Sequence, residues 1–434
     1  MKIKEAFLHY LWRTKNFDLD DLRTTDETSI QVLNFGEHNP NAGPDFLNAK
    51  IQIGDTTWAG NIELHVLSSD WYRHRHDRDD TYNNVILHVV YEQDERVRRK
   101  NGEEIPCIEL RKRIPPRLHT QYLRITNNQY WIPCQYHFPK VADITKSTWL
   151  NRLAIEKLER KIEGIGKELH KNKGNWEETF YHHIARSFGL KINVEPFKML
   201  AQFLPLLTLA KYKNNLFQLE AMIFGQSGLL DDRFREDYPN ELKKEFEFLK
   251  EKHGLFFGIP KEMWRFMRLR PANFPTIRLA QFAALVHKSS GLFSKILEAE
   301  KIEDLREHFN VEVSDYWKNH YVFDKPSKIK DKKIGKSMFS LLLINTIVPF
   351  LFLYGRERQI PEYEERALDF LEKLEPEKNS IITEWGKLGM RPENAYDTQA
   401  LIYLKNEYCL NKKCLDCAIG NSILSSFMPE KDIV

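Results

Sequence analysis

Residues 57–66, TWAGNIELHV, and residues 85–91, VILHVVY, decide the fold of the N-terminal part of this chain. In the first stretch polar and apolar side chains alternate from Asn61 to Val66, and this period of two is typical of a β-strand with one buried face. The second stretch is apolar almost throughout, which indicates a central strand that is covered on both faces. Together the two stretches predict a sheet with a buried core.

The neighbouring sequence extends this sheet. Three further segments are short, rich in β-branched residues and bounded by turn residues: Ser29–Phe35, Leu47–Ile53 and Ile105–Leu110. Gly54-Asp55 is a favourable hairpin turn between the second of these segments and the strand 57–66. The first residues, MKIKEAFLHYLWRT, are expected to form an amphipathic helix and not a signal peptide. We therefore expect residues 1–140 to form an α/β domain with a mixed sheet.

The periodicity becomes helical after Pro139. Apolar residues recur at helical intervals between Ser147 and Lys171, which predicts a long charged helix, and helical patterns then dominate to about residue 405. The predicted fold class is therefore α+β, with a mainly helical domain over residues 141–400. The cysteine-containing segment 401–434 is expected to pack on that helical domain.

One helical segment, Met338–Tyr354, is apolar over about 17 residues, at the lower limit for crossing a bilayer. It contains Ser340, Asn345, Thr346 and Pro349, and the sequence has no second segment of this kind. A buried helix is the favoured interpretation, and a membrane-associated protein is the weaker alternative.

The bulk composition narrows the class of protein. The 434 residues suffice for roughly two or three domains, and 42% hydrophobic with 29% charged residues is ordinary for a globular protein. A net charge of +3 does not by itself indicate a nucleic-acid binder, so any such surface must come from local clustering. Five cysteines in so long a chain do not indicate a disulfide framework. We expect a soluble, cytoplasmic protein with no membrane partner.

Glu63 and His65 are the first candidate site residues. Alternation along the strand 57–66 places them on one face, together with Asn61. A carboxylate and an imidazole on one face suit the binding of a divalent metal or a water molecule. A solvated, hydrogen-bonded surface explains the same pair, so both interpretations stay open.

Asp45 is the next candidate, and its position depends on strand register. A regular two-residue turn between the two strands sets Asp45 opposite Leu64, on the other face from Glu63. Asp45 reaches Glu63 only if its strand bends or bulges near Pro44. Without a bulge, Asp45 simply caps the entry to its strand.

Pro44-Asp45, seventeen intervening residues and Glu63-Leu64-His65 resemble the core of the PD-(D/E)xK nuclease superfamily. The resemblance implies that Asp45 and Glu63 bind Mg²⁺ or Mn²⁺, and that the N-terminal helix contributes Glu5. That superfamily has a lysine where this chain has His65, so a permanent charge becomes a titratable one that can also bind metal.

His74 and His76 follow in the stretch SSDWYRHRH. They are expected to add metal ligands or phosphate contacts, although an exposed loop of mixed charge explains either of them equally well.

The whole chain also resembles one bacterial family, called domain of unknown function 2851. The resemblance rests on motifs that occur in order from about Phe7 to Leu424: GPDF, GNIELHV, SSDWYRHRH, NNVILHVVYE, WRFMRLRPANFPTIRLAQ, NTIVPFLFLYG and LKNEYCLNKKCLDCAIG. The family is uncharacterised, so the resemblance implies no activity.

Three cysteines near the C-terminus have the spacing of metal ligands: Cys409-x4-Cys414-x2-Cys417. Such a group suits Zn²⁺ or an iron–sulfur cluster, and Cys134 is the best candidate for the fourth ligand. The arrangement is similar to the iron–sulfur loop of helix-hairpin-helix DNA glycosylases, with different spacing. Three reduced, partly buried thiols are the alternative.

The stretch from Trp264 to Arg278 interleaves arginines with aromatic residues. Arginine pairs with phosphates and aromatic rings stack on bases, so a nucleic acid is a natural partner for Arg265, Arg268, Arg270 and Arg278. Use of these side chains in the core and in ion pairs is the alternative.

These observations predict a metal-dependent nuclease in which Asp45 and Glu63 hold the metal and His65 orients or deprotonates the attacking water. A catalytically inactive scaffold that binds nucleic acid or protein is the alternative, since the replacement of lysine by His65 is also what a lost activity would leave.

Overall fold

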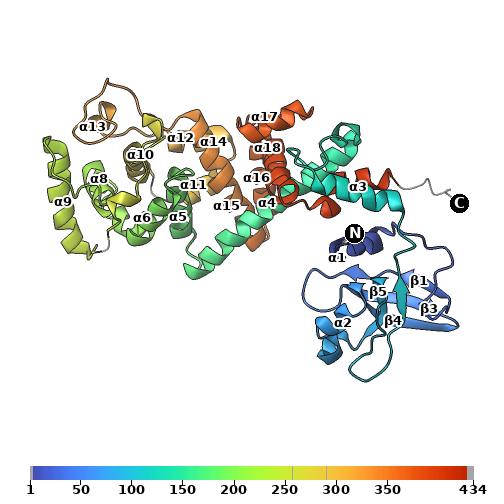
Figure 1. The fold of residues 1–434 in the computed structure, drawn as a ribbon. Coiled ribbons are helices and arrows are strands. Elements are labelled where there is room, and N and C mark those ends of the chain that lie inside the picture. The colour runs from blue at the N-terminus through green and yellow to red at the C-terminus, as the bar shows by residue number, and fades with distance from the viewer. Residues whose placement is uncertain (1–2, 257, 290, 428–434) are drawn as a thin grey trace. The chain divides into compact units, whose positions relative to one another are not determined.

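The computed structural model describes residues 3–256, 258–289 and 291–427. The fold class is α+β, as expected: a six-stranded mixed sheet with helices comes first, and a largely helical region follows (Figure 1). The chain divides into two compact units. The sheet unit holds the chain up to Leu153, Ser380–Arg391 and the chain from Leu401 onward, and the helical unit holds Ala154–Asn379 and Pro392–Ala400. This division differs from the expected boundaries after residues 140 and 400, because the cysteine-containing segment groups with the sheet.

The sheet has the order β1-β3-β4-β5-β6, and β2 pairs with β3 at its side. Strands β1, β3 and β4 are antiparallel, whereas β4, β5 and β6 run parallel to one another. All five strands expected from the sequence are present, and β2 is an addition. The strands are β1 Ile30–Asn34, β2 Glu37–His38, β3 Phe46–Ile53, β4 Thr56–Leu67, β5 Val85–Glu92 and β6 Cys107–Glu109.

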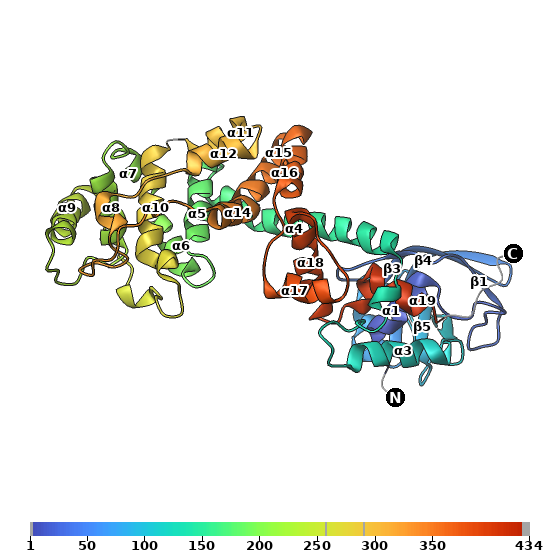
Figure 2. The same ribbon diagram turned by 90° about the horizontal axis from the view of Figure 1, so that it is seen from above.

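Strand β5 lies inside the sheet, between β4 and β6, and all residues from Val85 to Val90 are buried, as its apolar sequence predicts. The expected N-terminal helix is α1 (Glu5–Thr14), which buries Phe7, Leu8, Tyr10, Leu11 and Trp12 and packs against β4 (Figures 1 and 2). Phe7 stacks on Tyr122 of α3 (Pro116–Asn127), with ring centroids 4.8 Å apart. The helix thereby places its other face beside the carboxylates described below.

A β-bulge in β3 changes the register of the β3–β4 hairpin. Ile53 pairs with Thr56, as the two-residue turn dictates, but Phe46 pairs with Ile62, one residue off that register. The extra residue is accommodated around Asn48, whose φ of 59° is left-handed. Asn61 fixes this conformation, because its Oδ1 accepts the Asn48 N–H at 3.3 Å. The bulge therefore brings Asp45 opposite the Glu63 side of β4.

The first testable prediction concerns this bulge. Replacing Asn48 by Val should lower the free energy of unfolding by about 1–2 kcal/mol, because a β-branched side chain strains a left-handed backbone. Asn48→Gly should leave stability within about 0.5 kcal/mol of wild type, since glycine adopts positive φ without strain. Urea unfolding curves of the two variants measure the difference. Equal stability of both would show that the left-handed turn is not what sets the register.

The sheet unit also contains the first part of α4 (Asp143–Lys171) and the C-terminal part of the chain. Its helix α19 contacts α3, and the short turn Cys414–Asp416 contacts α1. Trp385 anchors this region, because its indole N–H donates to the Leu401 carbonyl at 3.0 Å. The remaining α-helices that lie wholly in this unit are α2 Asp70–Arg73, α17 Ser380–Lys387 and α19 Ala418–Ser425.

The helical unit is built around one large apolar core. Its helices are α5 Trp176–Phe188, α6 Val194–Phe203, α7 Leu206–Ala210, α8 Leu216–Gln226, α9 Asp237–His253, α10 Pro275–Lys288, α11 Leu292–Glu298, α12 Ile302–Phe309, α13 Asp315–Lys318, α14 Lys336–Leu342, α15 Val348–Arg358 and α16 Pro361–Lys373, with α18 Ala395–Tyr403 crossing into the sheet unit.

The apolar segment expected to be a buried helix lies in this core. It forms α14, a π-helical turn (Leu343–Ile347) and α15, which together run from Lys336 to Arg358. By length and composition this helix is able to cross a membrane, yet 78% of its most apolar window is buried inside the protein. Such extensive burial is expected of a helix in the core of a folded protein.

Candidate metal centre

The candidate site lies where the start of β3 meets β4. Glu63 and His65 lie on the same face of β4, and their side chains are only 4% and 1% exposed. The bulge in β3 adds Asp45 to this face. The Asp45 backbone N–H donates to Glu63 Oε2 at 3.1 Å, and Asp45 Oδ2 accepts the Leu64 N–H at 2.9 Å. Each strand thus fixes the carboxylate of the other.

Helix α1 adds two more polar groups. Nε2 of His9 lies 3.3 Å from Asp45 Oδ2 and 3.8 Å from Oε1 of Glu5. Burial raises the pKa of Glu5, and the nearby charge of Asp45 raises it further. Burial alone would lower the pKa of His9, but the hydrogen bond and the charge of Asp45 outweigh it and raise that pKa. The Asp45 carboxylate therefore favours the protonated form of His9.

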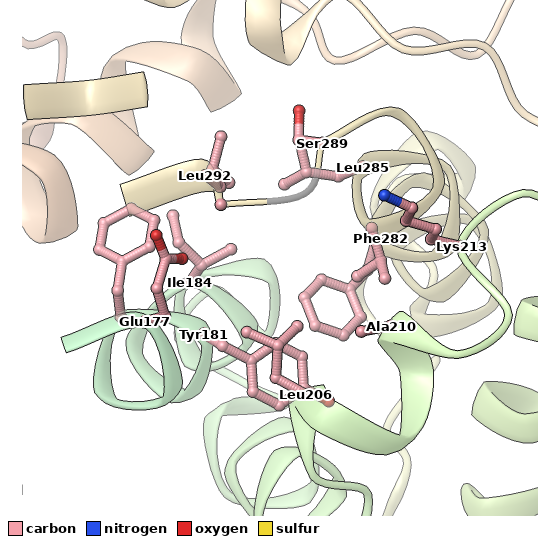
Figure 3. Close-up of a pocket in the computed structure, with 13 residues that line it drawn as sticks. Glu177, Tyr181, Ile184, Leu206, Ala210, Lys213, Phe282, Leu285, Ser289 and Leu292 are labelled. Atoms are coloured by element: carbon pink, nitrogen blue, oxygen red, sulfur yellow. The ribbon is translucent and has the colours of Figure 1, made fainter. Parts of the chain in front are cut away.

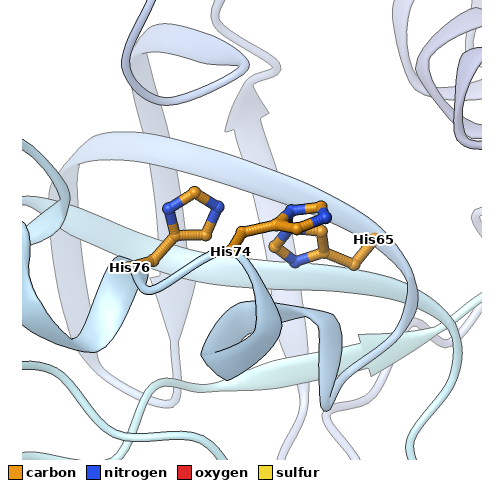
Figure 4. A group of neighbouring side chains, drawn as sticks. All are labelled: His65, His74 and His76. Carbon is orange, nitrogen blue, oxygen red and sulfur yellow. Dashed lines mark hydrogen bonds between the residues drawn. The ribbon is translucent and has the colours of Figure 1, made fainter.

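The segment after β4 returns two imidazoles to His65. Asp70 accepts the Leu67 N–H at 3.1 Å and so fixes the turn into α2, after which the chain reverses. Nε2 of His65 then lies 3.1 Å from Nδ1 of His74 (Figure 4). The ligand atoms of His65, His74 and His76 all lie within 4.8 Å of one another. That is a spacing at which three imidazoles share one metal ion.

Glu63 reaches the same point. Its Oε1 lies 3.6 Å from Nε2 of His65 and 3.3 Å from Nε2 of His76. The His76 ring is held by stacking on Tyr82, with centroids 3.8 Å apart, and by the edge of Trp71. Its Nε2 is buried and has no hydrogen bond of good geometry. A buried nitrogen lone pair without a partner, next to a carboxylate, fits a metal ligand.

His88 of β5 contacts His65 through the ring nitrogen of His65, Nδ1, that does not face His74. Nε2 of His88 lies 2.8 Å from Nδ1 of His65, and His88 is completely buried. Burial lowers the pKa of His88 to about 3 and lowers the pKa of His65 as well, so both rings are neutral near pH 7. One proton lies between the two rings. When it is bound to Nδ1 of His65, Nε2 of His65 carries a lone pair that is directed toward His74. Metal-binding histidines are commonly oriented by such a second hydrogen bond.

The site brings carboxyl groups together in a buried position, where ionisation is costly. Burial raises the pKa of Glu63 to about 9, and the charge of Asp45 contributes to this shift. A cation placed between Glu63 and the three imidazoles relieves this cost, because it favours the ionised carboxylate. The charge of the arrangement, like its geometry, therefore fits a bound cation.

Two of these residues were not among the sequence candidates. His9 had a signal, since it follows Glu5 by four residues and so shares its helix face. His88 also had one, because it is the single polar residue within VILHVVY and must find a partner in the sheet. That partner is His65. The contact depends on the parallel pairing of β4 and β5, in which Glu63 lies opposite His88.

The arginines of the 264–278 stretch divide into two groups. Arg265, Arg268 and Arg270 are exposed, as a docking surface requires. Arg278 is 7% exposed, and its guanidinium donates to Gln281 Oε1 at 2.7 Å and to Asn273 Oδ1 at 2.5 Å. Burial lowers its pKa to about 10. Arg278 therefore differs from the exposed docking side chain that was expected: it is hydrogen-bonded within the helical unit and lines a pocket with Tyr321 and Lys332.

The helical unit contains an apolar cavity of about 140 Å³. Figure 3 shows Tyr181, Ile184, Leu206 and Phe282 around it. Its carboxylate, Glu177, is occupied, since it accepts the Ser294 N–H at 3.0 Å and the Phe293 N–H at 3.2 Å. Most of the other described side chains that line this cavity are apolar.

The fold and the site define an α+β protein with a histidine–carboxylate centre on one face of a mixed sheet. Residues 5–380 match the family described as "Protein of unknown function (DUF2851)", so the chain belongs to that family. No curated protein and no solved structure matches the chain. The family description assigns no activity, and function must be argued from the site.

Proposed function

We propose that this protein is a metal-dependent hydrolase that cleaves phosphodiester bonds in nucleic acid. The observation that supports this proposal is the convergence of Glu63, His65, His74 and His76 on one point beside Asp45. The resemblance of Asp45, Glu63 and His65 to PD-(D/E)xK nucleases remains a hypothesis within the proposal.

The donor set favours a transition metal. Three imidazole nitrogens and one carboxylate suit Mn²⁺ or Zn²⁺, whereas Mg²⁺ prefers a shell of oxygen ligands. Of the two ions that the resemblance implies, Mn²⁺ is therefore the better fit. When bound, such an ion neutralises phosphate charge and lowers the pKa of a coordinated water.

The residues around the centre have distinct roles in this proposal. Glu63, His65 and His76 are buried and hold the cation, while the exposed His74 completes the shell and faces solvent, where substrate arrives. Asp45 is already fixed by the Leu64 N–H, so it positions Glu63 and pairs with His9. His9, with its raised pKa, is the proton donor nearest to the two carboxylates.

A hollow on the helical unit, lined by three cationic and several apolar side chains, supports nucleic acid as the partner. It encloses about 710 Å³, and Lys161, Arg186 and Lys191 line it. Leu269 also lines it, and the neighbours of Leu269 in the chain are the exposed Arg268 and Arg270. Cationic side chains around a hollow of this size provide contacts for a phosphate backbone.

The test of this function is a cleavage assay on labelled single- and double-stranded DNA and RNA, with Mn²⁺, Zn²⁺ or Mg²⁺ and with a chelator. We expect cleavage that requires metal, is fastest with Mn²⁺ and stops when the chelator is added. The alternative is an inactive scaffold. Folded, metal-loaded protein that binds these nucleic acids without cleaving them would establish the scaffold instead, and Arg268→Ala with Arg270→Ala would then test the docking surface.

A further inference from the structure

Four of the five cysteines lie in two segments of the sheet unit, one just before α4 and the other at its C-terminal end. Cys134 comes from the first segment, and Cys409, Cys414 and Cys417 come from the second. Lys405 connects the two, because its ammonium group donates to the Trp131 carbonyl and lies 4.8 Å from the centre of the Trp131 ring. This contact lies three residues before Cys134 and four before Cys409.

The C-terminal loop that carries three of the cysteines is tightly turned. Cys409 ends a π-helical turn, and its carbonyl accepts the Lys412 N–H at 3.2 Å. Lys412 itself has a left-handed backbone, with a φ of 53°. Cys414 starts a short 3-10 turn, and Cys417 is the N-cap of α19. Gly420 lies directly against this turn, since a Cβ at that position would come within 2.1 Å of the Cys414 carbonyl oxygen.

None of the four thiols forms a disulfide, and Cys134, Cys414 and Cys417 are buried. The groups lie within electrostatic range of one another, since Cys134 and Cys409 are each affected by Cys414 and Cys417. Four free thiols gathered from two distant segments provide the number of ligands that a zinc ion or an iron–sulfur cluster requires.

A buried donor without a partner lies beside these cysteines. Cys417 is the N-cap of α19, and the nearby indole N–H of Trp149 is buried and has no hydrogen-bond partner among the described residues. The Trp149 ring packs on Tyr408, the residue before Cys409, with centroids 5.4 Å apart. Buried donors are nearly always satisfied in proteins, so an acceptor that the described residues do not supply fits this position.

The spacing of the sulfurs distinguishes between two occupants. A ZnS₄ tetrahedron with Zn–S bonds of 2.3 Å has sulfurs about 3.8 Å apart. Among the described residues, the three histidines of the candidate centre lie within 4.8 Å of one another, and the cysteines form no such group. An iron–sulfur cluster spreads its ligands over several iron atoms and so holds the sulfurs further apart.

We propose that Cys134, Cys409, Cys414 and Cys417 bind an iron–sulfur cluster. The cluster is independent of the hydrolase proposal, since it lies on other residues and needs no reaction at the histidine centre. It joins a segment near residue 134 to one beyond residue 400, and so holds the C-terminal region on the sheet unit.

The test is the metal content and the visible spectrum of the full-length protein purified without oxygen. We expect iron and acid-labile sulfide in stoichiometric amounts, and a broad visible absorption that bleaches on reduction. Cys417→Ser should lose most of this iron and absorption. Cys107→Ser is the matched control, because Cys107 is equally buried but lies in β6, and it should keep both.

Because the wild-type measurement does not depend on any variant folding, it decides the matter alone. Zinc without iron or sulfide in wild-type protein would overturn the cluster, as would protein that holds no metal and whose four thiols all react with an alkylating agent after mild unfolding. Equal loss of iron in Cys107→Ser and Cys417→Ser would also contradict the assignment.

Discussion

Replacing Glu63 by Gln should reduce metal-dependent cleavage by at least about 10²-fold. The amide keeps the size of the side chain and an oxygen for the Asp45 N–H, but it removes the charge that holds the cation between His65 and His76. Metal affinity should fall together with the rate, and the ratio of bound metal to protein is measured alongside the rate of cleavage. Stability should not fall, because burial already disfavours the charged carboxylate, whose pKa is raised to about 9.

Asp55→Asn is the matched control for this variant. Asp55 lies in the exposed turn at the far end of the same two strands, so the same change of charge there should leave both rate and metal content at wild-type values. If Glu63→Gln kept its metal and its full rate, the histidine–carboxylate centre would not be the active site.

Replacing Phe350 by Ala should lower the free energy of unfolding by about 3–5 kcal/mol, the cost of removing a large ring from a closed core. Phe350 lies in α15, is fully buried and packs against Phe180, His183 and Phe293, with ring centroids 5.1, 5.2 and 5.9 Å away. Denaturant unfolding followed by circular dichroism measures this loss.

Phe248→Ala provides the comparison for Phe350→Ala. Phe248 lies in α9 and is 60% exposed, so its loss should change stability by less than about 0.5 kcal/mol. Similar, small effects of both substitutions, together with wild-type protein that is extracted only by detergent, would mean that α15 faces lipid and not the core.

The strands could be predicted because their signal is local. In β4 and β5 the burial of each side chain follows from alternation or from a continuous apolar run, and both are visible within ten residues. The position of Asp45 could not be predicted in this way. It depends on Asn48 adopting a left-handed conformation, which Asn34 and Asn61 stabilise from other strands.

The histidine centre shows a second limit. Glu63 and His65 are adjacent in one strand, so their shared face was predictable. His9 and His88 come from other elements, and their approach is fixed only when α1 packs on β4 and when β5 pairs with β4 in parallel. Arg278 failed as a surface candidate for the opposite reason, since its stretch has the composition of a docking loop but continues into the buried helix α10.

The division of the chain into units has a consequence for folding. Residues 154–379 interrupt the sheet unit, whose last segments, 380–391 and those from Leu401, are made long after its strands. To complete the sheet unit, the chain must close a loop of more than two hundred residues. Until Trp385 has been synthesised, Trp131 and Phe138 lack the ring that packs on both of them. We expect the nascent chain to be most prone to aggregation in that interval.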